Sequence, residues 1–506
     1  MNWKKYQEHF KRHKLDEDHF VLGVDLGNAT SSIAYFDALR QNAEILDISG
    51  GYGKPSVPTV LQYINATDEW IFGEYAVINA NGQDPLLLGF VERMGENGLE
   101  PSIKSFAVKT VDVAARYIGE LIANCKSINP KAAIAGIVAV MPDFVPNEAV
   151  AALRAAFETA GYGGLLIDIV QERQAALAYF KHNSIDAKKA QKVLWLDFGD
   201  RALRGGLYEI KDDSKTIECL EAAHDTALGM AKFDKEIYDM LASVYCQNKG
   251  ITQDELNKTE REQLLTFAYG HKDVILNNEA SQTRIYYNFV HPPFSAVVYG
   301  ADVEGITRSW KGALEDFVNR LLGSNVADGI AVVCTGGGFE APWAKRKIAS
   351  IFKCTKVSFA KNTKGVLAAG ATYLAAGTFG FLPPFDFEIT DNHKRLHDIG
   401  INIKERFYTI LPRGSWLWQK PKTIYVIPEQ SPEIELFVRD EAGKILTLGK
   451  AEFKTTPKRP NGTTRIALDI EAIDADSYTV KIKDLGFGEM FPATNQVESF
   501  EMRIQC

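Results

Sequence analysis

The stretch VLGVDLGNATSSIAYF, from Val21 to Phe36, decides how this chain is expected to fold. Apolar residues lead to Asp25, the segment 26–29 turns the chain, and residues 31–36 read as a returning strand. Glycine and asparagine tolerate the positive φ of a tight turn. Such a turn can point backbone N–H groups at an anion, and a carboxylate at the strand end can hold a cation or its water. The stretch predicts a β-hairpin suited to a phosphate; an ordinary structural hairpin is the alternative.

A second copy of this pattern favours the phosphate interpretation. VLWLDFGDRALRGGLYEI, from Val193 to Ile210, repeats the apolar strand, the Asp-x-Gly turn and the returning strand. Asp25 and Asp197 are 172 positions apart (197 − 25 = 172). A repeat of this length indicates a duplicated domain. We therefore predict an α/β protein with two like-folded lobes that close on one phosphate chain between them.

Composition and length limit the class of protein. The 506 residues allow about three domains, each with its own core. A net charge of −8 gives no support to a nucleic-acid partner, which usually needs a basic face. No apolar run approaches the roughly 18 residues of a membrane span, and the six cysteines are scattered with no CxxC pair. These features predict a soluble cytoplasmic protein without a membrane partner, a zinc site or a disulfide framework.

The pattern of helix and strand signals divides the chain into five parts. They are an N-terminal extension (1–19), lobe I (20–184), lobe II (185–378), an apolar linker (379–392) and a β-sandwich (393–506). The extension has aromatic residues at helical spacing and is expected to form a short helix. The sandwich is predicted from six short strand-like stretches, the first TIYVI at 423–427 and the last SFEMRIQC at 499–506.

Within lobe II, helices are expected over 225–241, 253–278 and 364–377, the last closing the lobe. The segment IAVVCTGGGFEAPWAKRKIASIF (330–352) reads as a strand, a triple-glycine turn and a helix. Such a turn brings backbone N–H groups and a helix N-terminus close to a ligand. A tight packing turn is the alternative.

Taken together, these motifs resemble the seventy-kilodalton heat-shock chaperones, which belong to the actin and sugar-kinase superfamily. DLGNAT is similar to the first phosphate loop of that family, LDFGDRALRGGLYEI to the second, and DTALGMAKFD to the glycine turn of its second lobe. TGGGFEAP is similar to the adenosine loop, and LPRGSWLWQ to the start of the peptide-binding sandwich. The resemblance covers nearly the whole chain from about Phe20. It implies ATP or ADP with Mg²⁺ between the lobes and an unfolded or extended peptide client on the sandwich.

The resemblance also implies roles for individual residues. Asp25, Glu172 and Asp197 would be the catalytic carboxylates, with Asp25 and Asp197 holding Mg²⁺ through water. The implied nucleotide contacts are Gly27, Asn28, Ala29, Gly199, Asp200, Arg201, Gly229, Lys272, Gly336, Gly337 and Gly338. Trp416 and Trp418 alternate around Leu417, so they form either part of the sandwich core or an exposed aromatic patch for a peptide.

The second phosphate loop departs from the family pattern. Three glycines and a threonine are replaced by the segment Gly199–Ala202, and an expected aspartate is Arg204. The side chains of Asp200 and Arg201 would block the close backbone approach that glycine permits, and Asp200 would repel a phosphate. Arg204 would put a cation where an acceptor for the water of Mg²⁺ is expected.

Other departures lie in the remaining loops. Asn28 and Ala29 replace two threonines, and the lysine expected near FVERMG is absent, with Arg93 the nearest cation. Arginine and lysine are not interchangeable as point charges. In the adenosine loop Glu340 replaces an arginine and Gly338 a serine. The sequence ends where the helical lid of the family would begin, so a lidless member is expected.

Two hypotheses follow. The loss of several positioning groups, each worth about 10²–10³ in rate, predicts a chaperone-like protein with absent or feeble ATP turnover. The alternative is a working ATP-driven chaperone in which Arg201 or Arg204 clamps the phosphates. A sugar kinase or a filament-forming protein would not account for the sandwich. The sandwich itself is expected either to bind an extended peptide by β-augmentation or to serve as a packing or dimerisation module.

Overall fold

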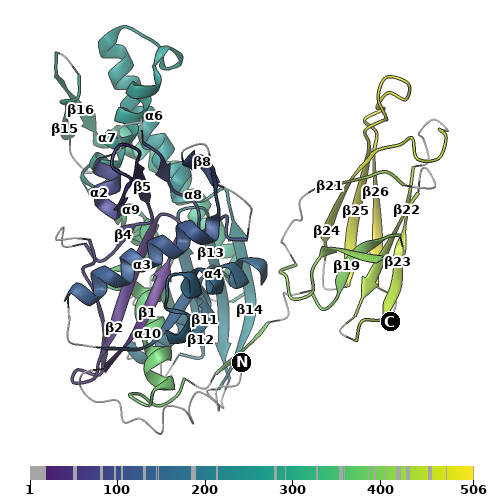
Figure 1. Cartoon of the computed structure of the whole chain (residues 1–506), viewed down its shortest axis with the longest axis horizontal. Helices are drawn as coiled ribbons and strands as arrows, with labels where there is room; N and C mark the ends of the chain where they lie inside the picture. Colours follow the sequence, from purple (N-terminus) through teal and green to yellow (C-terminus); the bar gives the residue numbers. More distant parts are fainter. Residues whose placement is uncertain are drawn as a thin grey trace. The chain divides into compact units, whose positions relative to one another are not determined.

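The computed structural model separates into two compact units, Met1–Thr390 and Asp391–Cys506 (Figure 1). It describes residues 19–49, 54–79, 84–95, 99–103, 106–128, 133–143, 145, 147–183, 190–211, 215–277, 282–290, 292–325, 329–352, 357, 359–385, 387–391, 395–404, 406–417, 423–428, 433–440, 442–453, 459–473 and 476–504. The helix predicted for the N-terminal extension falls outside these residues. Among them, no helix is long and apolar enough to cross a membrane.

Each lobe of the first unit is built on one central sheet. The lobe I sheet has the order β11-β10-β1-β2-β3, with β4 beside β2. Its strands are β1 (His19–Leu26), β2 (Thr30–Asp37), β3 (Asn42–Ile45), β4 (Val57–Pro58), β10 (Ala133–Met141) and β11 (Leu166–Gln171). The lobe II sheet has the order β17-β12-β13-β14-β18. Its strands are β12 (Lys192–Phe198), β13 (Leu203–Ile210), β14 (Thr216–Asp225), β17 (Ile330–Thr335) and β18 (Glu388–Asp391).

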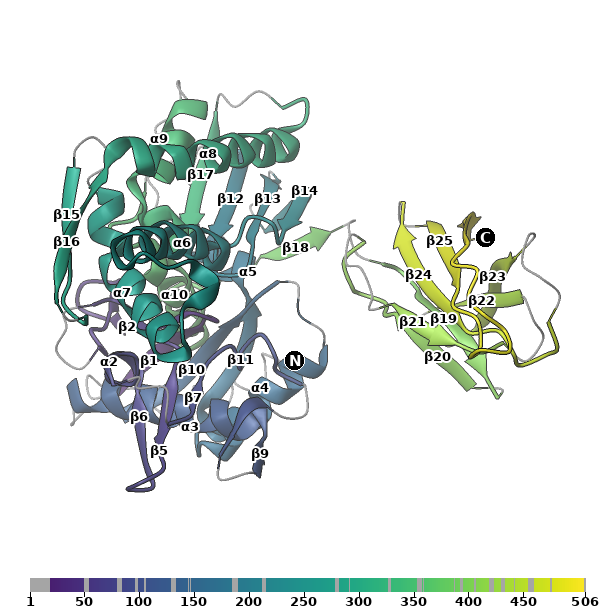
Figure 2. The ribbon, with the colours of Figure 1, turned by 90° about the horizontal axis from the view of Figure 1, so that it is seen from above.

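The two sheets repeat one pairing pattern. β1 runs antiparallel to β2 and parallel to β10. In the same way, β12 runs antiparallel to β13 and parallel to β17. Figure 2 shows the strands of lobe I below those of lobe II. The duplication read from the sequence is therefore a duplication of the sheet, with one Asp-turn hairpin in each copy.

Two helices pack between these sheets, α5 (Glu172–Asn183) and α10 (Val366–Thr378). They lie so close that a Cβ on Gly370 would come within 1.9 Å of the carbonyl oxygen of Ala175. α10 also lies on the lobe I sheet, where the Thr372 hydroxyl donates to the carbonyl of Ala34 over 3.0 Å. The segment that was expected to close lobe II is thus a helix that also lies on the lobe I sheet, because its small residues allow the close approach.

The remaining elements of lobe I surround its sheet. They are β5 (Leu61–Ile64), β6 (Glu69–Phe72), α2 (Gly73–Ile78), β7 (Leu86–Leu87), β8 (Leu99–Ile103), β9 (Phe106–Val108), α3 (Thr110–Ile128), α4 (Asn147–Thr159) and the 3₁₀ turn η1 (Gly163–Leu165). α3 and α4 pack against each other and bury their apolar faces in the same core as β1 and β10.

Lobe II carries a larger helical part. Its elements are α6 (Met230–Lys249), η3 (Gln253–Glu255), α7 (Lys258–Asn277), β15 (Gln282–Tyr287), β16 (Phe294–Tyr299), α8 (Gly300–Leu322), η4 (Gly337–Glu340), α9 (Pro342–Ile351) and η5 (Thr363–Gly365). The helix expected over 225–241 starts late, because Asp225 ends β14 and Gly229 is the N-cap of α6. The helix expected from 253 is a short 3₁₀ turn followed by α7.

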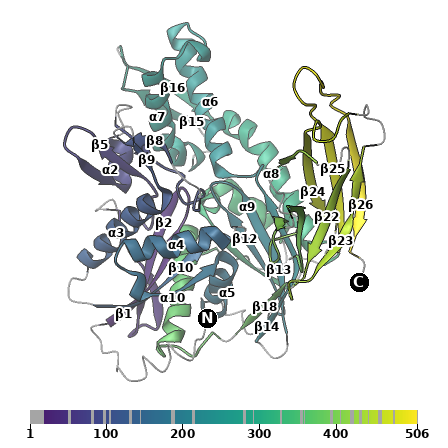
Figure 3. The same cartoon turned by 45° about the vertical axis from the view of Figure 1, so that its right-hand side comes forward.

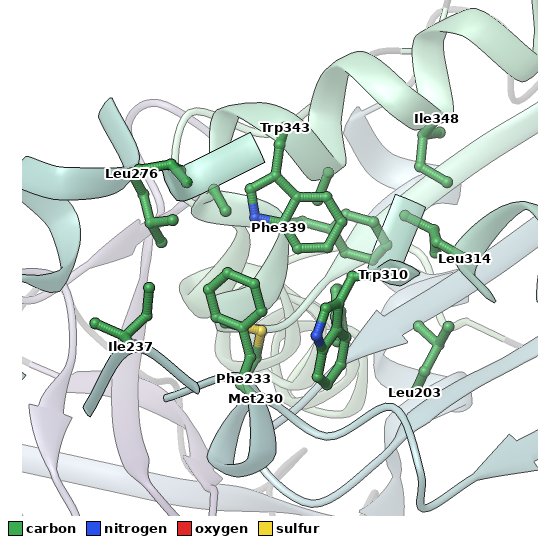
Figure 4. Packing of buried hydrophobic residues seen from close by; sticks show 14 of the residues in the cluster. Leu203, Met230, Phe233, Ile237, Leu276, Trp310, Leu314, Phe339, Trp343 and Ile348 are labelled. Carbon is green, nitrogen blue, oxygen red and sulfur yellow. The ribbon is translucent and has the colours of Figure 1, made fainter. Parts of the chain in front are cut away.

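Aromatic side chains fill the core of lobe II (Figure 4). The ring of Phe233 is stacked on Trp343 at 5.6 Å and meets Trp310 edge-on at 5.3 Å, both measured between centroids. Trp343 and Phe339 are both fully buried. The segment that precedes and begins α9, predicted to be an adenosine loop, thus contributes Phe339 and Trp343 to this hydrophobic core.

The second unit is an all-β sandwich (Figure 3). Its sheets have the orders β20-β19-β22-β23 and β21-β24-β25-β26. The strands are β19 (Asp398–Ile403), β20 (Arg406–Leu411), β21 (Ile424–Val426), β22 (Glu433–Arg439), β23 (Ile445–Glu452), β24 (Ile466–Ala472), β25 (Ser477–Asp484) and β26 (Val497–Arg503). β19 and β20 were not among the six predicted strands, although their residues pair in a hairpin with only two residues between them. In β22 and β25, buried residues alternate with partly exposed ones, as expected for strands that face a core on one side.

The sandwich contains a buried ion pair. Asp484 accepts hydrogen bonds from Arg459 Nη1 and Nη2 at 2.8 and 2.9 Å, and both side chains are almost fully buried. The backbone N–H groups of Gly486 and Thr494 also donate to this carboxylate. Burial alone would raise the pKa of Asp484, but Arg459 and these hydrogen bonds outweigh it and hold the pKa below its usual range.

Candidate functional site

The two hairpin aspartates occupy equivalent positions of the duplicated sheet. Asp25 is paired with Ser32 across the antiparallel ladder, and Asp197 is paired with Arg204. Both partners lie seven residues after their aspartate (32 − 25 = 7 and 204 − 197 = 7). The register of the second hairpin therefore puts a guanidinium beside Asp197, where the first hairpin has a small hydroxyl.

Arg204 is the centre of a buried ion cluster. Its Nη1 atom donates to both carboxylate oxygens of Glu172 at 2.8 Å and to Asp197 Oδ2 at 3.1 Å. The exposed fractions of the three side chains are 12%, 9% and 4% for Arg204, Glu172 and Asp197. Charge-assisted hydrogen bonds in such a dry site are the strong kind. The guanidinium of Arg204 thus bonds to both of the predicted catalytic residues Glu172 and Asp197.

Burial of this cluster shifts the pKa values of its titratable groups. Burial, and then the charge of Asp197, raise the pKa of Asp25 to about 8, although Arg204 opposes the shift. Burial likewise raises the pKa of Glu172, again against the effect of Arg204. Burial and the Arg204 charge lower the pKa of the neighbouring His224 to about 4, so its imidazole is neutral at pH 7. Arg204 is therefore the cation that offsets these carboxylates.

A second layer of polar residues orients the cluster, and the sequence interpretation missed it. Arg173 Nε lies 3.2 Å from Asp143 Oδ1, and the Arg173 N–H donates to Asp143 Oδ2 over 3.1 Å. This buried pair fixes the first turn of α5, which begins at Glu172. The hydroxyl of Thr335 donates to Asp197 Oδ1 over 2.8 Å. Asp143 follows directly on the proline after β10, a signal that was available in the sequence.

The tips of the two hairpins touch each other. Asn28 Nδ2 donates to Asp200 Oδ2 over 2.9 Å, and these residues are 172 positions apart, as Asp25 and Asp197 are. Arg201 Nε lies 2.8 Å from Glu92 Oε2 and 3.3 Å from Asp200 Oδ2. The N–H of Glu92 in turn donates to Asn28 Oδ1 over 3.3 Å. The residues that replace the family's glycines and threonine therefore join lobe I to lobe II.

Backbone groups of the second loop are also used within the protein. The N–H groups of Met230 and Ala231, at the start of α6, donate to the carbonyls of Gly199 and Asp200 at 3.0 and 2.8 Å. A Cβ on Gly229 would lie 2.5 Å from the carbonyl carbon of Arg201. The N-terminus of α6, which could have faced a phosphate, thus faces the carbonyls of the turn between β12 and β13.

The first loop is held from lobe I. Thr59 donates through its hydroxyl to the Gly27 carbonyl over 2.8 Å and through its N–H to the Ala29 carbonyl over 2.9 Å. The side chain of Ala29 is exposed and that of Asn28 is half-buried. These contacts fix the turn that presents Asn28 to the opposite lobe.

The predicted adenosine loop lies against the second hairpin. Gly336 has a φ of 89°, and a Cβ there would lie 2.5 Å from the Phe198 carbonyl oxygen. A Cβ on Gly338 would lie 2.3 Å from the Phe198 ring, and one on Gly337 would lie 3.0 Å from Lys364. Gly336 and Gly338 are therefore needed for close packing against Phe198, which is the structural alternative to ligand contact, whereas a side chain at 337 would meet only the flexible end of Lys364.

Two charged residues near this loop have partners within lobe II. Glu340 Oε1 accepts from the N–H and the hydroxyl of Thr363 at 2.5 and 2.6 Å. Lys272, on α7, forms an ion pair with Asp234 of α6. The side chains that would be expected to meet a base are thus used to join elements of the lobe.

One of the two carboxylates implied to hold Mg²⁺ through water, Asp197, is already bonded to Arg204. Mg²⁺ prefers carboxylate and water oxygens in octahedral geometry. Here a guanidinium nitrogen already takes two oxygens of Glu172 and one of Asp197. In the described part of the chain, no group of three or more His, Cys, Asp or Glu residues is arranged to hold a metal ion.

The structure describes one of the two predicted peptide contacts, Trp416. Trp416 is 3% exposed, and the Arg395 guanidinium donates to its carbonyl oxygen. Of the two alternatives for this side chain, burial favours a role in the core. Trp418 lies outside the described residues.

The duplicated sheets, their equivalent hairpins and the two helices between them define a two-lobed, actin-like nucleotide-binding body, here joined to an all-β sandwich. A family model described as Hsp70 protein matches residues 90–394, and one described as a domain of unknown function (DUF8552) matches residues 395–504. The chain therefore belongs to the Hsp70 family.

Curated relatives are similar over most of the chain. The chaperone protein DnaK of Trichormus variabilis is 24% identical over 493 residues, which cover 89% of this chain and 69% of the relative. DnaK of Thermotoga neapolitana is 24% identical, with 94% of this chain and 80% of the relative covered. DnaK of Deinococcus radiodurans is also 24% identical, with 92% and 78% covered.

Proposed function

We propose that this Hsp70-family member is a chaperone whose two lobes are held together by their own charged side chains and that turns over ATP feebly or not at all. The observation that carries the proposal is the contact of Arg204 with Glu172 and Asp197. A nucleotide with Mg²⁺ would need these carboxylates, and it would first have to displace a buried guanidinium. We expect the displacement to be costly, because it would leave a charge without its partner in a dry site.

The competing hypothesis is a working ATPase with substitute arginines. It requires Arg204 and Arg201 to give up their present ion pairs. Arg204 would have to leave two carboxylates to reach a phosphate. Arg201 would have to leave Glu92 and Asp200, and the acidic partner of each would remain near the incoming anion. The ion pairs therefore favour the first hypothesis.

We assign the client-binding role to the sandwich. The curated relatives are chaperone proteins, and the described strands form two open sheets with edge strands that an extended peptide could extend. Client binding would then be independent of ATP, since the lobes already have an internal link. The proposal keeps the cytoplasmic location expected from the sequence.

Calorimetric titration with ATP and ADP, with and without Mg²⁺, tests the nucleotide part, with phosphate release followed in the same samples. We expect no Mg²⁺-dependent release from the wild type. Arg204→Asp, which restores the expected acidic residue, should gain Mg²⁺-dependent nucleotide binding. Arg204→Ser is a second variant without an added charge, because Ser32 occupies the equivalent position in lobe I.

Arg201→Asp is the matched control, since it changes the same loop but leaves the buried cluster intact, and it should gain nothing. ATP turnover by the wild type that Asp25→Ala abolishes would overturn the proposal. The client part is tested by suppression of the aggregation of a chemically unfolded protein. Protection that requires ATP would contradict an ATP-independent chaperone.

A further inference from the structure

Among the described strands of the sandwich, β26 forms an edge that differs from the other edges. β26 ends the sheet β21-β24-β25-β26, and its seven residues pair with β25 in an unbroken register. The other edge strands carry features that hinder the addition of a further strand. β20 and β23 each have an extra residue, Ile410 and Leu448, at a shift in register, and β21 has only three residues. β26 is therefore the long and regular edge of this unit.

The pairing of β26 with β25 shows which backbone groups lie on its free side. The Ile504 N–H donates to the Asp476 carbonyl at 2.8 Å, directly after the last pair of the ladder. Because residues alternate in an antiparallel ladder, the N–H and C=O groups of Glu501 and Arg503 point away from β25. Within the described residues, these groups have no backbone hydrogen bond on that side. They offer donors and acceptors to a further strand.

The side chains of the same two residues are exposed and carry opposite charges. Across the ladder, Glu501 is paired with Thr479 and Arg503 with Ser477, so neither has a charged residue directly opposite it. The edge strand β23 also has a lysine and a glutamate two residues apart, but its Lys450 already forms an ion pair with β22. The charges of β26 are thus available to a strand that is added to this edge.

The order of the residues makes this edge complementary to itself. When two β26 strands pair antiparallel around a two-fold axis at Met502, Glu501 of each copy lies opposite Arg503 of the other. Both residues direct their backbone groups to the partner strand in that register, so each pair can exchange two hydrogen bonds. Phe500, which is only partly buried against the sandwich core, then lies opposite Ile504 of the other copy. A register centred on Glu501 would instead place two glutamates opposite each other, which is unfavourable.

From these features we propose that the β26 edge binds a second copy of this chain, by antiparallel β26–β26 pairing that joins two sandwich sheets into one. The interface is isologous, because both copies use the same edge. It rests on one short ladder, so we expect a dimer that dissociates on dilution. The inference goes beyond the proposed chaperone function and does not depend on it. An extended client peptide is the competing occupant of this edge, and the experiment distinguishes the two.

Sedimentation velocity of the full chain over a range of concentrations measures the association. We expect a monomer–dimer equilibrium for the wild type. Glu501→Arg and Arg503→Glu each replace two attractive pairs by two repulsive ones, so each should raise the dissociation constant about ten- to hundred-fold. The double variant with both substitutions restores the two attractive pairs and should dimerise like the wild type. An equimolar mixture of the two single variants should form a heterodimer, because one copy then has two cations and the other two anions.

Arg406→Glu is the matched control, because Arg406 is exposed on β20, an edge strand of the other sheet, and its reversal should leave the dissociation constant unchanged. Hydrogen exchange gives a second measurement: backbone amides of residues 497–503 should exchange more slowly at high protein concentration than at low.

A wild type that stays monomeric at every concentration would overturn the proposal. So would a dimer that neither single charge reversal weakens, or a mixture of the two single variants that does not associate. Protection of the β26 amides by an extended peptide, in a chain that remains monomeric, would assign this edge to a client and equally contradict a second copy as its partner.

Discussion

Replacement of Arg204 by methionine should expose the energetic role of the buried cluster. Methionine keeps much of the side-chain volume, so the change removes mainly the guanidinium charge and its three hydrogen bonds. Glu172 and Asp197 would remain almost fully buried without their cation. Breaking a buried pair in this way costs about 3–5 kcal/mol of the free energy of unfolding. We expect a loss of this size at pH 7.

The loss should depend on pH in a defined direction. Burial already raises the pKa of Glu172 in the wild type, and removal of Arg204 takes away the group that opposes the shift. A carboxyl with a raised folded-state pKa destabilises the protein as the pH rises above its unfolded-state pKa. The difference between wild type and variant should therefore be smallest near pH 4.5 and grow towards pH 8.

Urea unfolding of the full chain at several pH values, with and without 5 mM MgCl₂ as a chosen condition, measures these effects. Mg²⁺ should restore part of the stability of Arg204→Met, since it can neutralise the vacated carboxylates, and should not stabilise the wild type. Arg201→Met is the matched control: its ion pair with Glu92 is about half exposed on both sides, so the loss should stay below about 1 kcal/mol. Equal stability of wild type and Arg204→Met at every pH would refute the reasoning.

Three further substitutions test other parts of the fold by the same unfolding measurements. Gly370→Val should lower the free energy of unfolding by about 3 kcal/mol, the upper end for overpacking, because its Cβ would meet the Ala175 carbonyl. As a control, Gly305→Ala in α8, which has open space around it, should raise the free energy of unfolding by about 0.5–1 kcal/mol. Equal effects of the two substitutions would contradict this explanation. Asp484→Asn should destabilise the sandwich by about 3 kcal/mol at pH 7. Because the folded-state pKa of Asp484 is lowered, the difference in stability between wild type and variant should shrink as the pH falls below about 4. A difference that does not change with pH would contradict this prediction. Asp25→Asn should have little effect on stability near pH 4. Because the pKa of Asp25 is raised to about 8, the variant should become more stable than the wild type as the pH rises to 8, by at most about 1.4 kcal/mol per pH unit. A less stable variant at pH 8 would show that the charge of Asp25 is favourable there.

Local sequence patterns were sufficient to predict the architecture. The hairpins around Asp25 and Asp197, their spacing and the helical periodicity of the segments between them are local signals, and they predicted the two-lobed α/β body. The strand–turn alternation after residue 423 predicted the sandwich. β19 and β20 were missed because DIGINI and RFYTIL (398–403 and 406–411) alternate well but are joined by a turn of only two residues, without glycine or asparagine.

The use of the site residues was harder to predict, since it depends on contacts between distant segments. The sequence indicated that Arg204 replaces an acidic residue, but not that its guanidinium reaches Glu172, which comes from the other lobe through α5. Asp200 was interpreted as a residue that repels a phosphate, whereas in the fold it accepts a hydrogen bond from Asn28. Such pairings require the relative placement of two sheets, which no local pattern encodes.

The duplication nevertheless held a signal that could have found one of these contacts. When the tips of two equivalent hairpins meet, residues at equivalent positions can face each other, so residues 172 positions apart are candidates for contact. Asn28 and Asp200 satisfy this condition and form a donor–acceptor pair.

The same comparison explains the asymmetry of the site. Equivalent register puts Ser32 beside Asp25 and Arg204 beside Asp197. A second arginine in place of Ser32 would bring two guanidinium groups to one cluster of carboxylates, whereas serine in place of Arg204 would leave that cluster without its cation. One small and one cationic residue at the two equivalent positions thus provide the single positive charge that this closed arrangement needs.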